Sequence, residues 1–246
     1  MFSIFKKNKE SETVNYFPFT TDIHSHILPG IDDGSPDVAT SIMLIKGLMS
    51  LGVKNSIATP HIIGDLYRNN PETINNALQI LKQELKIQQI DFEVRAAAEY
   101  MLDSYFFELI NSDQKLLTLK DNIILTEFSY ASMPDDPGKF SFAIQMAGYS
   151  PILAHPERYP YYYDNYKMYH RLADLGFMLQ LNLLSLTGYY GKEAAKAADY
   201  MLKNELVSFV GSDMHHERHL AMLSESRSKA SFNKFLSHRN WNDFLE

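Results

Sequence analysis

The 246-residue chain contains no cysteine. This absence excludes disulfide bonds, thiolate metal ligands and every mechanism that depends on a cysteine nucleophile. Any metal site would therefore have to use histidine nitrogens and the oxygens of aspartate and glutamate. Such donors favour Mn, Fe, Zn or Mg over soft metals.

The chain also lacks a long apolar run. No segment approaches the roughly 20 apolar residues that cross a bilayer, so we predict no transmembrane segment. Residues 1–12 (MFSIFKKNKESE) place apolar residues before the lysines, whereas a signal peptide places its charges first. We interpret residues 1–16 as a flexible tail. Weak contact of its lysines with an anionic membrane or a partner is the alternative.

A surplus of basic residues is absent too. Lys and Arg number 23 against 30 Asp and Glu, which gives a formal net charge of −7 and argues against a general nucleic-acid binder. No linker rich in Pro, Gly or Ser divides the sequence, and no internal repeat is found. A chain of this length can bury a large α/β core, so we expect residues 1–246 to form a single domain.

Short apolar runs that favour β-structure alternate with amphipathic stretches, which is typical of a parallel sheet or barrel. The strands expected are residues 19–24, 55–59, 92–99, 122–127, 151–155, 177–182 and 207–213. The helices expected are residues 37–51, a long helix from position 71, 104–111, 138–147, 166–175, 192–204, 217–229 and 232–245. Seven βα units are one fewer than in the common eight-stranded barrel. The sequence therefore predicts either an irregular barrel or one undetected strand.

Residue types that bind metals end or follow six of these strands. In a parallel barrel the C-terminal strand ends carry the functional residues, so these side chains are expected at one mouth. Two of them, His24 and His26, are two positions apart and point to the same side. The strand-end candidates are His24, His26, His61, Glu99, Glu127, His155, Asp213 and His215. This number exceeds one coordination sphere and predicts two or three divalent ions, a site that suits phosphate esters.

Several carboxylates leave alternatives open. Asp22 precedes the first pair and is a candidate to orient a histidine from behind. In the turn at 28–34 (LPGIDDG), Asp33 is preferred to Asp32 as a further ligand, and a solvated turn is the alternative. Glu99 follows three alanines, where a buried carboxylate is costly unless it is paired or binds metal, and its two oxygens could bridge two ions. For Glu127 a salt bridge is the alternative.

Two arginines each follow a candidate ligand by three residues. Arg158 follows His155, and Arg218 follows His215. A guanidinium matches phosphate oxygens, so the two predict a phosphate clamp, whereas each alone is compatible with a surface ion pair. The tyrosine-rich run at 159–169 is expected to cover the barrel rim or to stack on an aromatic substrate. Gln180 and Asn182 either face the mouth or satisfy hydrogen bonds in the core.

These motifs together resemble the polymerase and histidinol phosphatase (PHP) superfamily. The matching segments are DIHSHILPGIDDG at 22–34, ATPH at 58–61, AAAEY at 96–100, LTEFS at 125–129, AHPERY at 154–159, LQLN at 179–182 and GSDMH at 211–215. Within the superfamily, the chain is similar to the bacterial manganese-dependent protein-tyrosine phosphatases that regulate capsule and exopolysaccharide synthesis. The resemblance implies a distorted seven-stranded α/β barrel, (β/α)7, and a cytoplasmic enzyme, with peripheral association with the membrane left open.

The resemblance also implies a trinuclear site and a set of partners. The first ion would take His24, His26, Glu99 and Asp213; the second Glu99, Glu127 and His155; the third Asp33, His61 and His215. Manganese is the metal expected, and Arg158 matches the phosphate-binding arginine better than Arg218, whose loop is short. The substrate implied is a phosphotyrosyl protein, and the usual partner is a tyrosine autokinase that is often at the membrane.

Three other functions compete with this hypothesis. The nearest is the same chemistry on a small phosphate ester such as histidinol phosphate. The second is an amidohydrolase, which also begins with His-x-His but usually bridges its metals with a modified lysine. The third is a metal-stabilised binding protein without catalysis.

Overall fold

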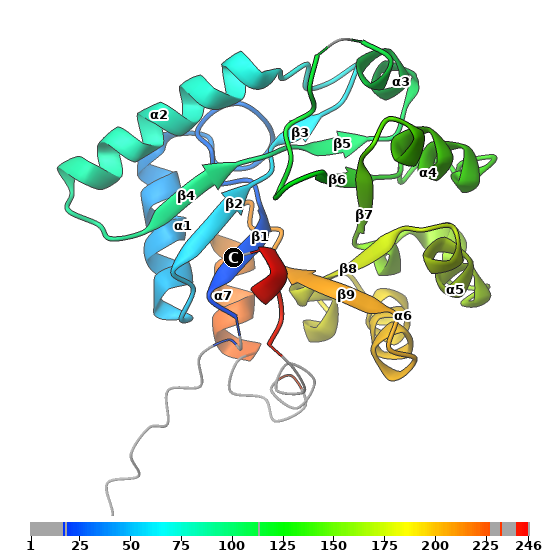
Figure 1. Cartoon of the computed structure of the whole chain (residues 1–246). Helices are drawn as coiled ribbons and strands as arrows, with labels where there is room; N and C mark the ends of the chain where they lie inside the picture. The colour runs from blue at the N-terminus through cyan, green and yellow to red at the C-terminus, as the bar shows by residue number, and fades with distance from the viewer. Residues whose placement is uncertain (1–16, 18, 113, 227–231, 233–239, 246) are drawn as a thin grey trace, which may run out of the picture.

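Parallel strands form the centre of this computed structural model, which describes residues 17, 19–112, 114–226, 232 and 240–245 (Figure 1). In this part of the chain the strands make two hydrogen-bonded sheets, with the orders β1-β2-β4 and β3-β5-β6-β7-β8-β9, and every pairing is parallel. Their bounds are β1 Thr21–Ser25, β2 Asn55–Ala58, β3 His61–Ile62, β4 Glu93–Ala96, β5 Glu99–Met101, β6 Ile123–Glu127, β7 Ser150–Ala154, β8 Met178–Asn182 and β9 Val207–Gly211.

Two of the ring positions are each occupied by a broken strand. Thr59 and Pro60 separate β2 from β3, and two alanines separate β4 from β5. The pairing continues across the breaks, because Ala97 N donates to Ala58 O at 2.8 Å and Glu99 N donates to Pro60 O at 3.1 Å. Proline has no N–H to donate, which explains an interruption at this point. The described strands therefore occupy seven positions, and the seven-stranded prediction is confirmed, with β3 as the short segment that it missed.

The ring closes between β9 and β1. Asp213 N donates to His24 O at 2.8 Å, and His26 N donates to Met214 O at 2.9 Å. These bonds lie beyond the last residue of β9, so the two sheets join at the C-terminal end of the strands. The fold is thus a distorted α/β barrel, as the sequence predicts, and its closure point is built from residues next to the candidate ligands.

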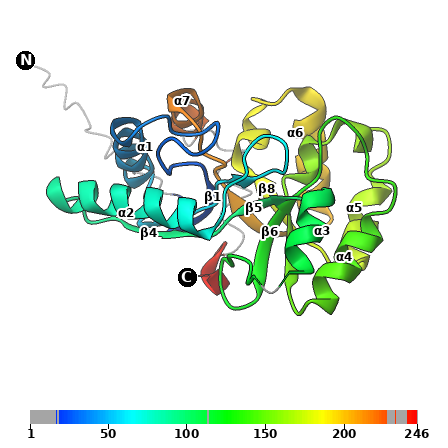
Figure 2. The ribbon, with the colours of Figure 1, turned by 90° about the horizontal axis from the view of Figure 1, so that it is seen from above.

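Helices surround the strands on both sides. Figures 1 and 2 show α1, α2 and α7 on one side of the barrel and α3 to α6 along the other. Asp37, Asn70, Asp103 and Asp136 cap the first four helices by accepting hydrogen bonds from first-turn amides, as N-cap residues do. The helices are α1 Val38–Ser50, α2 Pro71–Ile87, α3 Ser104–Ile110, α4 Pro137–Met146, α5 Lys167–Asp174, α6 Lys192–Lys203 and α7 Glu217–Ser226, with 3₁₀ turns at Pro156–Arg158, Pro160–Tyr162, Leu183–Thr187 and Asp243–Leu245.

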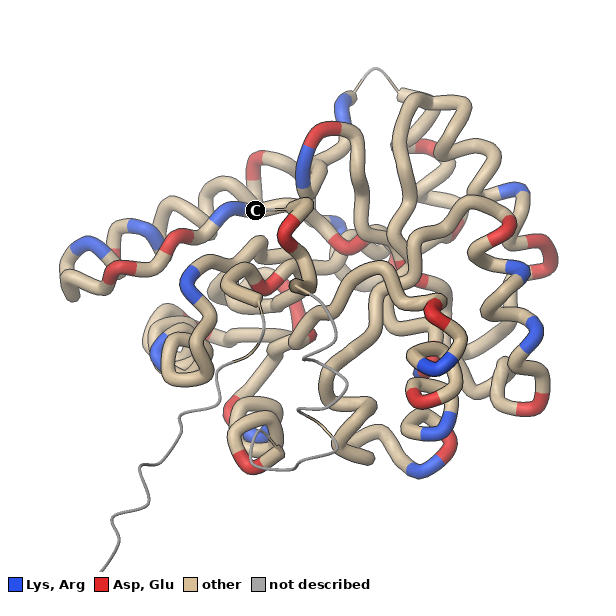
Figure 3. The backbone as a smooth tube through the Cα atoms, turned by 60° about the horizontal axis from the view of Figure 1, so that its bottom comes forward, with Lys and Arg blue, Asp and Glu red and all other residues tan. Residues whose placement is uncertain are grey.

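The first seven predicted helices are confirmed, with boundaries that differ by a residue or two where they are described. The tail predicted for residues 1–16 and residues 233–239 of the helix predicted for 232–245 lie outside the described residues. Over 240–245 the helix prediction is wrong, because residues 240–242 are not helical and Asp243–Leu245 form a 3₁₀ turn. Basic and acidic residues alternate along the outer helices (Figure 3), in keeping with the small acidic surplus. Among the helices described, none has the length and apolarity to cross a membrane.

The apolar core has two parts. The larger lies between strands and helices, and the smaller links residues on opposite sides of the ring, so it fills the barrel interior. The smaller cluster consists of Ile23, Ile57, Ala97, Leu119, Ile123, Leu125, Ile152, Ala154, Phe209 and Leu245. Leu125 and Glu127 alternate with Thr126 along β6, so the carboxylate continues the inward-facing row toward the mouth.

Candidate metal centre

The nine predicted ligands meet at the C-terminal mouth of the barrel. Each contributes to at least one of four overlapping groups in which one donor atom per residue lies within 4.8 Å of the others. The groups are His26, Asp33, His61 and His215; His24, His26 and Asp213; His24, Glu99 and His155; and His61, Glu99 and Glu127. They come from strand ends that are far apart in sequence, and parallel strand direction brings them together.

The first pair of histidines faces two carboxylates. His24 Nε2 lies 3.3 Å from both Glu99 Oε2 and Asp213 Oδ1, and His26 Nε2 lies 3.4 Å from the same two oxygens. Two nitrogens and two oxygens therefore converge on one small volume. This is the donor set that the resemblance implies for the first ion.

Glu99 presents its two oxygens to different neighbours. Oε1 lies 3.1 Å from His155 Nε2, whereas Oε2 lies 3.2 Å from His61 Nδ1 in addition to the first histidine pair. His61 Nδ1 is also 2.9 Å from Glu127 Oε1. Glu127 thus lies beside His61, and His155 groups with His24, a different division from the one that the resemblance implies. A carboxylate with both oxygens facing nitrogen donors has the geometry to bridge two ions.

The two adjacent aspartates of the first loop have different surroundings. Asp33 Oδ1 lies 3.5 Å from His61 Nε2 and 3.6 Å from His215 Nε2, and its side chain is 54% exposed. Asp32 instead pairs with His26 Nδ1 at 2.8 Å and accepts from the Gly34 and His61 amides. The geometry therefore favours Asp33 as the ligand and gives Asp32 the part of orienting His26 from behind.

Several donor atoms at the centre of the cluster are buried without hydrogen bonds. His61 Nδ1, Glu99 Oε2 and Glu127 Oε1 have no hydrogen-bond partner among the described residues, although the nitrogen lies 3.2 Å from the Glu99 oxygen and 2.9 Å from the Glu127 oxygen. Buried polar atoms are nearly always satisfied, so each exception needs an explanation. Converging nitrogen and oxygen atoms of this kind suit a cation, and hard nitrogen and oxygen donors fit a divalent ion of the first transition row or Mg²⁺.

The charges of the cluster also favour a cation. Burial disfavours the charge of Glu99, but the His24 and His61 imidazoles outweigh it and hold the pKa of this carboxyl well below its usual range. Burial and then repulsion by Glu99 raise the pKa of Glu127. Burial, followed by nearby Arg158, lowers the pKa of His155 to about 4, so this imidazole is neutral, which is the form that binds metals.

Two candidate ligands have left-handed backbone conformations. His155 follows β7 with φ of 36°, and Asp213 follows β9 with φ of 50°. A non-glycine residue in this region costs of order 1–3 kcal/mol and persists where the surrounding structure holds it, often at functional sites. Close packing assists here, because a Cβ at Gly211 would lie 2.7 Å from the His24 Cβ. The two ligands therefore adopt strained backbone conformations at the mouth. Position 211 needs glycine because a larger residue would collide with His24.

Residues behind the cluster hold the ligands in place. His24 Nδ1 pairs with Gln180 Oε1 at 2.8 Å, and Asn182 Nδ2 donates to Asp213 Oδ2 at 2.7 Å. Such partners fix the orientation of a ligand. The prediction that Asp22 orients a histidine is wrong: its carboxylate accepts from the Ser212 amide and hydroxyl, and reaches only the backbone N of His24. Asp22 therefore ties β1 to the segment that follows β9.

The structure separates the two clamp arginines. Arg158 Nη1 donates to Asp213 Oδ2 at 2.5 Å, and its guanidinium carbon lies 3.9 Å from the centre of the Tyr190 ring and 5.1 Å from that of Tyr130. Arg218 is exposed and lies 5.3 Å from the Tyr189 ring centre. Only Arg158 contacts a candidate ligand within the described residues.

The sequence analysis did not identify Tyr130, whose ring packs beside this arginine. Tyr130 follows the LTEFS segment directly, and its hydroxyl lies 3.2 Å from His155 Nδ1. The available signal was its position three residues after Glu127, on a loop that leaves the same mouth.

Comparison with known proteins identifies the family. A family model described as capsular polysaccharide synthesis, CpsB/CapC, matches residues 20–229. The tyrosine-protein phosphatase YwqE of Bacillus subtilis (strain 168) is 32% identical over 196 residues, which cover 79% of this chain and 77% of that protein. The putative tyrosine-protein phosphatase CapC of Staphylococcus aureus is 29% identical over 194 residues, covering 79% of this chain and 76% of that protein.

The fold agrees with this assignment. A solved structure from a study of YwqE from Bacillus subtilis and CpsB from Streptococcus pneumoniae, described as unique metal-dependent tyrosine phosphatases, superposes with a TM-score of 0.75. It is 28% identical and covers 90% of this chain and 95% of that one. With the family model matching most of the sequence, the chain belongs to the CpsB/CapC family of capsular polysaccharide synthesis proteins.

Proposed function

We propose that this protein is a metal-dependent tyrosine-protein phosphatase. The observation that carries the proposal is the convergence of nine His, Asp and Glu side chains on one mouth, with the Arg158 guanidinium directly beside them. Relatives that are 32% and 29% identical over 79% of this chain are named a tyrosine-protein phosphatase and a putative tyrosine-protein phosphatase. The absence of cysteine requires a mechanism other than attack by a thiolate.

The nine ligands are proposed to hold two or three divalent ions, with manganese preferred over iron, zinc or magnesium. Bound ions would supply an activated water and neutralise charge on the oxygens of the phosphoryl group. The nitrogen and oxygen donor set supports a metal of this group, since it disfavours soft metals, and the preference for manganese rests on the resemblance. The proposed ligands are His24, His26, Asp33, His61, Glu99, Glu127, His155, Asp213 and His215.

Arg158 is proposed to bind the phosphate. Its planar guanidinium is held between the Tyr130 and Tyr190 rings, and one of its nitrogens already bonds to a candidate ligand. A phosphate oxygen that replaces Asp213 Oδ2 as acceptor would meet an oriented, permanently charged donor. Arg218 is proposed to contact the substrate at the rim, where it packs on Tyr189.

The substrate is proposed to be a phosphotyrosyl protein. An exposed aromatic side chain beside the cluster, Tyr130, is suited to packing against the ring of a phosphotyrosine. By resemblance, the partner is a tyrosine autokinase, and the enzyme acts in the cytoplasm, with association at the membrane surface. We also propose that the chain functions as one domain, because the candidate ligands come from β-strand ends throughout the barrel.

A comparison of substrates tests the proposal. The purified protein should hydrolyse a phosphotyrosyl peptide with a kcat/KM well above that for histidinol phosphate. Chelation should abolish turnover, Mn²⁺ should restore it, and iodoacetamide should have no effect. Preference for histidinol phosphate would favour the small-ester alternative, and amide hydrolysis without phosphatase activity would favour an amidohydrolase. Full activity in metal-free protein would exclude the proposed mechanism.

A further inference from the structure

Tyr130 contacts two parts of the proposed site at once. Its hydroxyl lies 3.2 Å from His155 Nδ1, and its ring stacks on the same imidazole with centroids 5.8 Å apart. The second part is the Arg158 guanidinium, which lies over the Tyr130 ring, 5.1 Å from the ring centre. One side chain therefore contacts both a proposed ligand and the proposed phosphate-binding residue.

The loop that carries Tyr130 is held at the two residues before it. The Phe128 amide donates to the Tyr159 hydroxyl at 2.9 Å, and the Tyr161 hydroxyl donates to Ser129 O at 3.0 Å. Tyr159 in turn donates to Ala154 O, next to His155. The tyrosine-rich run is therefore more than a rim cover, since two of its hydroxyls bind the backbone on the β6 side of the site to the backbone on the β7 side.

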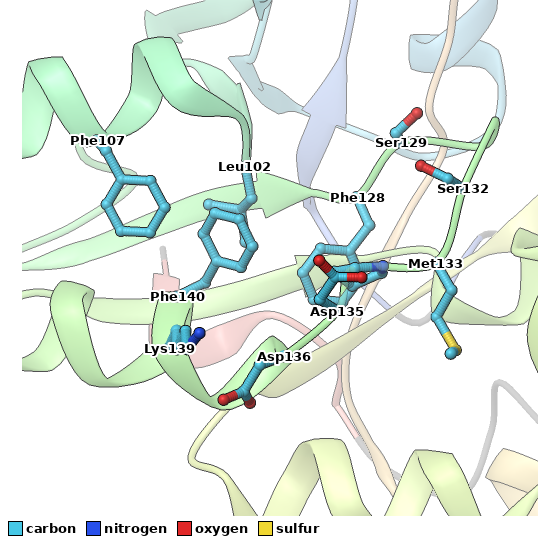
Figure 4. Close-up of a pocket in the computed structure, with 11 residues that line it drawn as sticks. Leu102, Phe107, Phe128, Ser129, Ser132, Met133, Asp135, Asp136, Lys139 and Phe140 are labelled. Atoms are coloured by element: carbon cyan, nitrogen blue, oxygen red, sulfur yellow. The ribbon is translucent and has the colours of Figure 1, made fainter.

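Apolar contacts anchor the same loop on its far face. Phe128 is buried and packs against Phe140, with ring centroids 6.2 Å apart. Figure 4 shows it within a pocket of about 380 Å³ that Leu102, Phe107 and Phe140 also line. Phe128 and Tyr130 both pack against Tyr159, with ring centroids 5.8 Å and 5.3 Å apart. The buried Phe128 therefore anchors the loop two residues before Tyr130.

We propose that Tyr130 is a positioning residue that orients His155 for metal binding and holds the guanidinium plane of Arg158. The inference deepens the proposed function and rests on it for the identity of the ligands. His155 Nε2 faces Glu99, so Nδ1 is the nitrogen left for a supporting hydrogen bond. In the neutral imidazole that binds through Nε2, Nδ1 carries the proton and donates it to the Tyr130 oxygen. The tyrosine proton stays available for a substrate or solvent oxygen.

Two conservative variants separate the hydroxyl from the ring. Tyr130→Phe keeps the ring on Arg158 and removes only the partner of His155. Loss of such a partner typically weakens metal binding by about 10- to 100-fold. Equilibrium titration with Mn²⁺, without substrate, should show this loss for one class of sites, and excess Mn²⁺ should restore most of the turnover. Tyr130→Ala should show the same loss of metal affinity and, at saturating Mn²⁺, a rise in KM for aryl phosphates of about 2- to 30-fold.

The matched control is Tyr162→Phe. Tyr162 belongs to the same cluster, is fully buried, and its hydroxyl has no hydrogen-bond partner among the described residues. This variant should bind Mn²⁺ as the wild type does, whereas Tyr161→Phe, which frees the loop at Ser129, should fall between the control and Tyr130→Phe. Equal Mn²⁺ affinity of Tyr130→Phe, Tyr162→Phe and wild type would overturn the inference. A shift in affinity without phosphatase activity in the wild type would keep it and reject only the proposed reaction.

Discussion

The two ends of the barrel treat buried polar groups in opposite ways. At the C-terminal mouth, donor atoms of three candidate ligands are buried without hydrogen bonds among the described residues. At the opposite end, Asn242 Nδ2 donates to Thr21 O and Val210 O, and its Oδ1 accepts from Val210 N. Arg95 donates to Leu119 O and Leu245 O at 3.0 Å each. The described C-terminal residues thus close this end of the barrel with satisfied hydrogen bonds. At the mouth, by contrast, the three ligand atoms stay unpaired.

This difference shows which polar groups serve stability and which serve a ligand. A satisfied buried hydrogen bond stabilises the fold, because removing one partner strands the other. A convergent set of unpaired donors costs stability until a cation binds. Leu245 at the sealed end belongs to the same interior cluster as Leu125, which lies two residues before Glu127 on β6, so apolar side chains lie between the two environments.

The largest effect is expected from Glu99→Ala. If this carboxylate serves two ions at the mouth, its loss should remove more than one metal equivalent and abolish turnover. Elemental analysis of the folded protein, checked by circular dichroism, measures the first, and a phosphopeptide assay the second. Glu93→Ala, which removes an exposed carboxylate at the start of β4, is the control and should keep full occupancy. Full metal content in Glu99→Ala would exclude a bridging role.

Arg158→Ala should keep its metals and lose turnover. One lost charge-assisted contact to the phosphate should cost about 2–4 kcal/mol, or roughly 30- to 1,000-fold in kcat/KM. Arg158→Lys should recover little, since a point charge lacks the planar fork. Arg218→Ala should have a smaller effect, and Arg171→Ala on α5 should have none. If Arg218→Ala proves the more damaging, the phosphate-binding assignment must move to the exposed rim.

At the sealed end, Asn242→Ala should lower stability and leave the chemistry unchanged. The substitution strands buried backbone groups of Val210 and Thr21 and should cost about 1–3 kcal/mol. Urea unfolding measures this loss, and kcat/KM at a temperature where the variant is folded should match the wild type. Asn204→Ala, which removes an exposed hydrogen bond to Tyr200 O, is the control. A loss of turnover in folded Asn242→Ala would show that the hydrogen bonds at the sealed end also affect the chemistry at the mouth.

The smallest effect is expected from Glu127→Gln in chelated protein. Burial and the neighbouring Glu99 charge disfavour the ionised form of Glu127, so the neutral amide should leave unfolding free energy within about 1 kcal/mol of the wild type or raise it. With Mn²⁺ the order should reverse, because the wild type gains more from binding than the variant. Urea unfolding with and without Mn²⁺ tests this. A large destabilisation without metal would show that Glu127 is a structural ion-pair residue.

The sequence alone predicted the seven-stranded barrel and the candidate ligands that the structure brings together, because both leave local signals. Strands and amphipathic helices have their own periodicities, and a His or Glu that ends an apolar strand is visible without a partner. The division of β2 and β4 by Pro60 and two alanines was less visible, since β3 spans only His61–Ile62. A two-residue strand carries no periodic pattern.

What only the tertiary structure decided is which residues meet. The adjacent Asp32 and Asp33 are equivalent in sequence, and the turn between β1 and α1 sends one carboxylate behind His26 and the other toward His61 and His215. Likewise, two arginines at the same spacing from a histidine end in different places, because left-handed turns, ring stacking and loop anchoring are set by residues distant in the chain. Contacts across the barrel mouth depend on strand register and on closure between β9 and β1, and no local pattern encodes either.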